Sequence, residues 1–142
     1  MNLYNQETSL DKATNEGVWA AYSDTFRLKL RGASGPEYRK VQDASAKQIR
    51  NAYKGRKVPD DIAEKNTLHC IANGLISDWD GGLDESGQPR PFVPGDDGKP
   101  LEFTPQAALE LISKYKRVRD FVMLFSVDDS NFESAEELQT KN

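Results

Sequence analysis

The sequence contains little of what enzymatic and metal-binding chemistry requires. Its 142 residues include one histidine and one cysteine, so a zinc site with two histidine ligands and an internal disulfide are both excluded. His69 and Cys70 are neighbours, and neighbours on a helix point about 100° apart, which prevents a close nucleophile–base pair. No glycine-rich motif that cradles phosphate is present. We therefore predict that the protein is not an enzyme and binds no cofactor and no metal.

Long hydrophobic runs are also missing. No stretch approaches the ~18 apolar residues that a membrane span requires, and the first twenty residues are polar and mixed, unlike a signal peptide. A lone cysteine fits a reducing compartment. A chain of 142 residues suits one domain. We therefore expect a single-domain protein that acts in the cytoplasm and has no membrane partner.

The net charge of −4 is unevenly distributed along the chain. Residues 27–57 contain ten lysines and arginines and two acids, whereas residues 58–111 contain eleven acids and three basic residues. One interpretation is that a basic and an acidic segment face each other in one fold. The other is that the basic segment contacts an anionic partner. Residues 133–142 are acidic and polar, which predicts a disordered tail.

Residues 17–31 are typical of a β-hairpin. The segment 25–31 alternates Phe26, Leu28 and Leu30 with basic residues, the pattern of a strand that has one buried face. The segment 17–22 precedes it across a short turn. Residues 1–16 have no periodicity and predict a flexible arm.

Residues 36–54 predict an amphipathic helix with a basic outer face, which Gly55 ends. The residues that would contact an anionic partner are Arg39, Lys47, Arg50 and Lys54. Tyr38 and Tyr53 fall on the apolar side, whereas a nucleic-acid platform would interleave aromatic rings with the charges. The pattern therefore favours a solvated face over nucleic-acid binding.

Two further helices are predicted at about 60–79 and 105–127, joined by the loop-rich segment 80–103. No proline forces the second of them to kink near Lys114–Lys116. The expected fold is therefore mainly α with a small N-terminal β-hairpin (α+β), in which about three main helices pack as a small bundle. Residues 17–132 would form the single globular domain.

The acids of residues 78–85 resemble a calcium-binding loop but fail its pattern. Gly82 stands where a ligand is needed, and Leu83 stands where the turn glycine is needed. We therefore expect Asp80 and its neighbours to be solvated loop acids.

An apolar stripe runs along residues 105–127 over five turns, and a small domain is not expected to cover all of it. Surplus apolar helix surface is where a partner protein docks. The predicted protein-binding residues are Trp79, Tyr115, Val118, Phe121, Val122 and Phe125. The alternative is that the stripe is core, and for any single residue this is the stronger interpretation.

Five segments taken in order resemble the tail assembly chaperones of long-tailed, siphovirus-type bacteriophages. They are residues 16–22, 26–38, 75–80 (Leu-Ile-Ser-Asp-Trp-Asp), 102–112 and 119–132 (from Arg-Asp-Phe-Val to Asn-Phe). No segment is a sharp signature by itself, and the likeness lies in their order along the chain.

The resemblance implies a chaperone that coats the tape measure protein and keeps it soluble until tube subunits polymerise around it. It also implies possible contact with the tail tube protein, self-association, a location in the host cytoplasm and absence from the mature virion. Two other classes of function stay open. One is a structural tail or connector subunit, and the other is a nucleic-acid or host-factor binder that uses the helix at 36–54.

Overall fold

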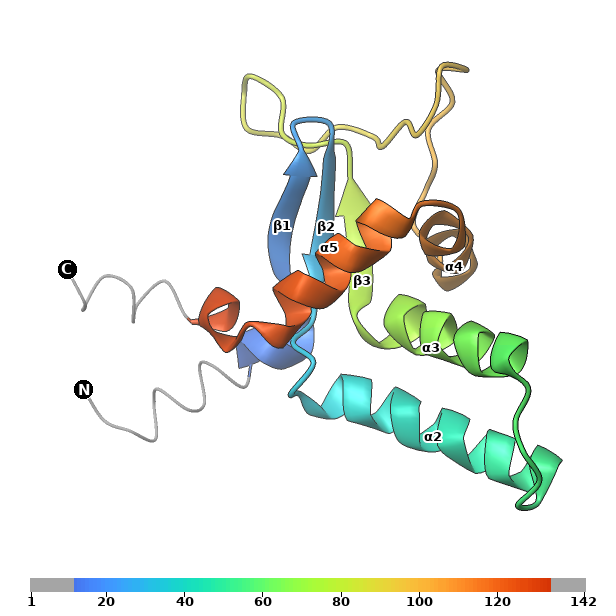
Figure 1. Ribbon diagram of the computed structural model, residues 1–142. Coiled ribbons are helices and arrows are strands. Elements are labelled where there is room, and N and C mark those ends of the chain that lie inside the picture. The colour runs from blue at the N-terminus through green and yellow to red at the C-terminus, as the bar shows by residue number, and fades with distance from the viewer. Residues whose placement is uncertain (1–11, 134–142) are drawn as a thin grey trace, which may run out of the picture.

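A three-stranded antiparallel sheet lies at the centre of the molecule (Figure 1), in a computed structural model that describes residues 12–133. Its strands, in the order β1-β2-β3, are β1 (Val18–Ser23), β2 (Phe26–Leu30) and β3 (Ile76–Asp80). Leu28 pairs with Ala20 on one side and with Trp79 on the other, and all three are buried. The opposite face carries Trp19 and the charged residues of β2. The sheet therefore has one core face and one polar face.

Helices cover the core face and extend the fold beyond it. They are α2 (Pro36–Tyr53), α3 (Asp60–Gly74), α4 (Pro105–Lys114) and α5 (Lys116–Val127), with a short helix at residues 12–16 and a 3-10 turn, η1 (Asp129–Phe132). Helix α5 lies across the sheet and contacts β1 and β2, whereas α2 and α3 form a hairpin that projects away from it (Figure 1). Helix α4 packs on α3.

The expected fold class, mainly α with a small N-terminal hairpin and a bundle of about three helices, is wrong. The described residues form five helices and a three-stranded sheet that lies at the centre. The helix expected over 60–79 ends at Gly74, and Ile76–Asp80 forms β3 instead. The spacing of Ile76 and Trp79 favours a helix, because a regular strand would place them on opposite faces. A register shift between Lys29 and Leu30 in the pairing with β2 accompanies the burial of both side chains. The open edge of β2 decides between helix and strand, because it offers a ladder of hydrogen-bond partners.

The helix expected over 105–127 is also two helices. Tyr115 has an extended backbone, with φ −116° and ψ 95°, and it separates α4 from α5. Its N–H still donates to the carbonyl oxygen of Leu111 and its carbonyl oxygen accepts from Arg119, so the break leaves few backbone groups unpaired. The break lets α4 pack on α3 while α5 turns onto the sheet.

The predicted arm and tail lie only partly within the described residues. Residues 1–11 and 134–142 lie outside them. Residues 12–16 form the short helix, in which Thr14 is buried and accepts the N–H of Gly32 through its carbonyl oxygen. This part of the expected arm therefore packs against the domain.

Asp80 is not a solvated loop acid, contrary to the expectation from the sequence. It is 9 % exposed at the end of β3, and it receives two hydrogen bonds from Arg27 of β2, at 2.9 Å from Nε and 2.5 Å from Nη2. Its Oδ1 also accepts the N–H of Gly82. The hydrogen bonds from Arg27 hold the pKa of Asp80 below its ordinary value, with a smaller contribution from Gly82. The pair joins β2 to the start of the loop that follows β3.

Replacing this carboxylate should weaken the protein in a pH-dependent way. We expect Asp80→Asn to lower the free energy of unfolding by about 1–2 kcal/mol at pH 7, because a charged hydrogen-bond partner is lost from a partly buried site. The lowered pKa means that this stabilisation is present above the unfolded pKa and is lost as the pH falls through the folded value. The deficit of Asp80→Asn should therefore shrink below about pH 4.

Urea unfolding of both proteins at pH 7 and pH 3 measures this difference. Asp78→Asn is the matched control, because Asp78 is exposed on the same strand and its substitution should change stability little at either pH. A deficit of Asp80→Asn that stays constant between the two pH values would contradict the assignment.

Candidate protein-binding groove

Three of the six predicted protein-binding residues lie in the core. Trp79 is 5 % exposed, and its indole N–H donates to the carbonyl oxygen of Leu101 at 2.9 Å. Val118 is 6 % exposed and Val122 is fully buried. A partner cannot reach Trp79 or Val122 while the domain is folded, and Val118 is accessible only where it lines an apolar groove.

The other three predicted residues differ from one another in exposure. Phe121 and Phe125 are half-buried. The ring of Phe121 packs edge-on against Tyr22, with ring centroids 5.4 Å apart. The ring of Phe125 packs edge-on against Phe132, with ring centroids 5.7 Å apart. Tyr115, at the break between α4 and α5, is 41 % exposed. The sheet and η1 therefore cover most of the predicted stripe, and its exposed part is the end at Tyr115.

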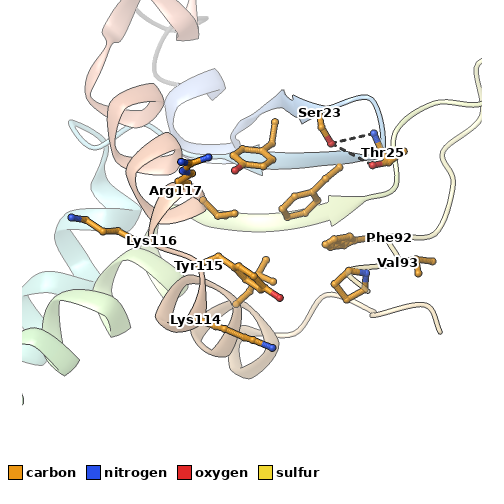
Figure 2. A pocket seen from close by; sticks show the side chains of 13 residues that line it. Ser23, Thr25, Phe92, Val93, Lys114, Tyr115, Lys116 and Arg117 are labelled. Carbon is orange, nitrogen blue, oxygen red and sulfur yellow. Dashed lines mark hydrogen bonds between the residues drawn. The ribbon is translucent and has the colours of Figure 1, made fainter. Parts of the chain in front are cut away.

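Tyr115 and Val118 belong to an apolar groove of about 420 Å³. Three segments that are far apart in the sequence form its walls: the β1–β2 turn, the loop after β3, and the junction of α4 with α5 (Figure 2). Its lining residues are Tyr22, Ser23, Thr25, Phe26, Phe92, Val93, Pro94, Leu111, Lys114, Tyr115, Lys116, Arg117 and Val118. The volume lies near the lower end of the roughly 300–1,000 Å³ typical of ligand pockets.

Aromatic packing holds the loop wall of the groove in place. The ring of Phe92 stacks on Phe26 with centroids 3.9 Å apart and planes 8° apart, and it packs edge-on against Trp79. Phe92 is 6 % exposed, whereas the adjacent Val93 is 41 % exposed and faces outward. The stacked ring thus anchors the loop, and the loop presents Val93 at the edge of the groove.

The lining of the groove carries basic side chains, and acids border it, since Asp97 and Glu110 line an adjoining hollow that shares Lys114 and Tyr115. Lys114, Lys116 and Arg117 are exposed there, and the described lining residues include no aspartate or glutamate. The ammonium group of Lys114 lies 5.4 Å from the ring centroid of Tyr115, within cation–π range. Figure 2 shows Tyr115 on the side of the groove that faces Phe92 and Val93, with Lys116 pointing away from it. The groove is therefore an apolar hollow with charged residues of both signs around it.

The predicted basic face on α2 is a second exposed surface. Arg39, Lys47, Arg50 and Lys54 are all exposed, and no ion pair joins them to a residue within 12–133. Helix α2 packs on α3 through its opposite side, where the hydroxyl of Ser45 donates to the side-chain oxygen of Asn66. Contact with an anionic partner at this face stays a prediction.

The remaining titratable groups do not form a reactive cluster in the part of the chain that the structure describes. Burial raises the pKa of the Cys70 thiol, which keeps it protonated near neutral pH. His69 is exposed and contacts Asn73. Among residues 12–133, no group of three His, Cys, Asp or Glu side chains is placed to hold a metal ion. Over the same residues, no helix is both long enough and apolar enough to span a bilayer.

Comparison with known proteins connects the chain to bacteriophages. The family model described as YdaY prophage protein matches residues 33–142, which include α2, α3, the loop wall of the groove and the α4–α5 junction. No curated protein and no solved structure matches the chain. Because the match covers more than half of the sequence, the chain belongs to the YdaY prophage protein family.

Proposed function

We propose that this phage protein is a tail assembly chaperone that holds an apolar segment of the tape measure protein in the groove beside Tyr115. The observation that carries the proposal is the groove itself, an apolar hollow open to solvent on a small domain. Open apolar surface of this kind marks a site for another molecule. The family membership supports the phage origin, and the order of the five resembling segments supports the chaperone role.

The size of the groove suits a chaperone that must release its client. A hollow of about 420 Å³ accepts one or two large side chains of a client segment. A client segment that is held by few side chains binds weakly. Weak binding appears mainly as a high dissociation rate, because affinity differences between related complexes lie mainly in that rate. Tube subunits that polymerise around the client can then displace the chaperone. Many weak contacts along a long client would still keep it covered.

Tyr115→Asp should abolish this holding without unfolding the domain. Tyr115 is 41 % exposed and sits between two helices, so its replacement removes groove surface at a small cost in stability. When the tape measure protein of the same prophage is co-expressed with the wild-type chaperone, we expect it in the soluble fraction and in the same pulldown. With Tyr115→Asp, most of it should become insoluble.

Leu124→Asp is the matched control for this experiment. Leu124 is 72 % exposed on α5 and lies outside the groove, so the tape measure protein should stay soluble with this variant. If Tyr115→Asp holds the client as well as the wild type does, the groove is not the client site. Mass spectrometry of purified virions tests the class of function, because stoichiometric copies in the virion would favour a structural tail subunit over a chaperone.

A further inference from the structure

The outer edge of β1 has no partner strand. The strand order is β1-β2-β3, and Figure 1 shows β1 as an outer strand of the sheet. Within residues 12–133, β2 is the only strand that pairs with it. An unpaired edge presents N–H and C=O groups to other chains, and proteins usually protect such edges with charged residues, prolines or a covering segment. The residues of β1, Val18–Ser23, include neither a charge nor a proline.

The opposite edge of the sheet, on β3, is protected. The backbone N–H of Trp79 donates to the carboxylate of Asp78 at 2.8 Å, so this group does not need a partner strand. The strand also contains a second acid, Asp80. The charged residues of the sheet therefore lie on β2 and β3, and the unprotected edge strand has none.

The pairing with β2 determines which backbone groups of β1 are already used. Successive residues of a strand direct their N–H and C=O groups to opposite sides. In β2, the N–H of Arg31 donates to the carbonyl oxygen of Leu75, on the side of β3. The preceding residue, Leu30, therefore faces β1, where it pairs with Val18. Hydrogen-bonded pairs recur at every second residue, so Ala20 also directs its backbone groups to β2.

The residues between and after them, Trp19 and Ala21, direct their backbone groups to the open side. These groups have no hydrogen-bond partner in the part of the chain that the structure describes. Both side chains are exposed and share the polar face of the sheet. There the guanidinium group of Arg27 lies 4.4 Å from the ring centroid of Trp19. The free edge is therefore short and uncharged, and an exposed aromatic ring lies beside it.

We propose that β1 pairs with β1 of a second copy of this chain, antiparallel about a two-fold axis at Ala20, so that two three-stranded sheets become one. Trp19 of each copy then pairs with Ala21 of the other, which gives four backbone hydrogen bonds across the axis. The large indole ring lies beside a small methyl group on the polar face. A two-fold axis places a strand against itself, so a charged edge would repel its copy, whereas the uncharged β1 does not.

The two neighbouring registers fit the strand less well. A shift toward the start of β1 requires the backbone groups of Gly17, but its N–H already donates to the carbonyl oxygen of Ala13 at 2.8 Å. The same shift places two Trp19 rings opposite each other. A shift toward the end requires Ser23, which follows an irregularity in the pairing after Ala21. The proposed register uses only the regular part of the strand.

Sedimentation equilibrium of the full chain tests the inference. We expect the mean mass to rise from that of one chain at about 1 µM to nearly that of two chains at about 1 mM, because so short a pairing belongs to the weak class of interfaces. Ala21→Pro should keep the mass of one chain throughout, since proline removes an N–H that β2 does not use. Leu124→Asp, which removes an exposed apolar side chain from α5, is the control and should dimerise like the wild type. A wild type that stays monomeric throughout overturns the inference.

Disulfide cross-linking tests the register and does not depend on the folding of Ala21→Pro. The two copies of Ala20 face each other at a non-hydrogen-bonded position, where Cα atoms lie about 4.5 Å apart, within reach of a disulfide. The two copies of Ser23 lie roughly 20 Å apart. Ala20→Cys should therefore form a covalent dimer on mild oxidation, whereas Ser23→Cys, although more exposed, should not. The native Cys70 is buried, so the wild type measures the background. Absence of a dimer with Ala20→Cys, or an equal yield from Ser23→Cys, overturns the inference.

The inference does not depend on what occupies the groove. Tyr115→Asp should leave the dimer intact, so a loss of client holding in this variant tests the proposed function alone. If Tyr115→Asp is monomeric and Ala21→Pro is dimeric, the copies meet at the groove and the inference fails. If the wild type is monomeric and the tape measure protein slows hydrogen exchange at Trp19 and Ala21, the edge binds the client instead, and the inference fails as well.

Discussion

Val122→Asp should unfold the protein, whereas Leu124→Asp should leave its free energy of unfolding within about 0.5 kcal/mol of the wild type. Val122 is fully buried on α5, the helix that packs on the sheet. Leu124, two residues later on the same helix, is 72 % exposed. A carboxylate at position 122 would lose its hydration without gaining a partner, which costs several kcal/mol. That is a large part of the 5–15 kcal/mol that typically stabilises a domain.

Circular dichroism and urea unfolding of the two variants measure this contrast. The helical signal and the cooperative transition should disappear for Val122→Asp and persist for Leu124→Asp. If Val122→Asp folds with near-wild-type stability, the apolar stripe on α5 is not core, and it becomes a candidate protein-binding surface again. The contrast thus separates the stripe from the groove, which the Tyr115→Asp experiment addresses.

The sequence predicts where apolar faces lie but not what covers them. Spacing identified Val118 and Val122 as members of one helical face, and α5 presents them on one face. Whether that face meets core or partner depended on the packing of α5 on β1 and β2, which are far from it in the sequence. The residues of β3 follow a helical spacing, and the pairing with β2, with its register shift at Leu30, makes them a strand instead.

Local sequence patterns predicted secondary structure where the residues of one segment are enough to determine it. The alternation of Phe26, Leu28 and Leu30 lies in β2, and the amphipathic pattern at 36–54 lies in α2, which ends at Tyr53. The break at Tyr115 has no local cause such as proline or glycine. Packing of α4 on α3 and of α5 on the sheet determines it, and this is tertiary information.

The groove could not be predicted for the same reason. Its walls come from residues 22–26, 92–94 and 111–118, and none of these segments carries a binding signal by itself. Phe92 stood among prolines in a segment expected to be loop, and its stacking on Phe26 is a long-range contact. The one hint in the sequence is the basic run at residues 114–117, which contains an aromatic residue, Tyr115.

Gly82→Ala should destabilise the protein by about 3 kcal/mol, and Gly87→Ala by about 1 kcal/mol. The two glycines have almost the same left-handed backbone, with φ of +84° and +83°, so alanine meets the same conformational cost at both. Their surroundings differ. A Cβ at Gly82 would overlap the carbonyl oxygen of Asp24 in the β1–β2 turn, whereas a Cβ at Gly87 would meet no atom within 4 Å.

The difference between the two variants isolates a contact that positions the groove. Gly82 donates its N–H to Asp80 and accepts from Arg90, so it cannot move away from Asp24 without breaking the start of the loop wall. The strain must therefore displace the β1–β2 turn, which includes Ser23 and Thr25 of the opposite wall. We expect urea unfolding to separate the two variants by about 2 kcal/mol. Equal destabilisation would mean that the turn yields freely and that the close approach of loop and turn does not define the groove.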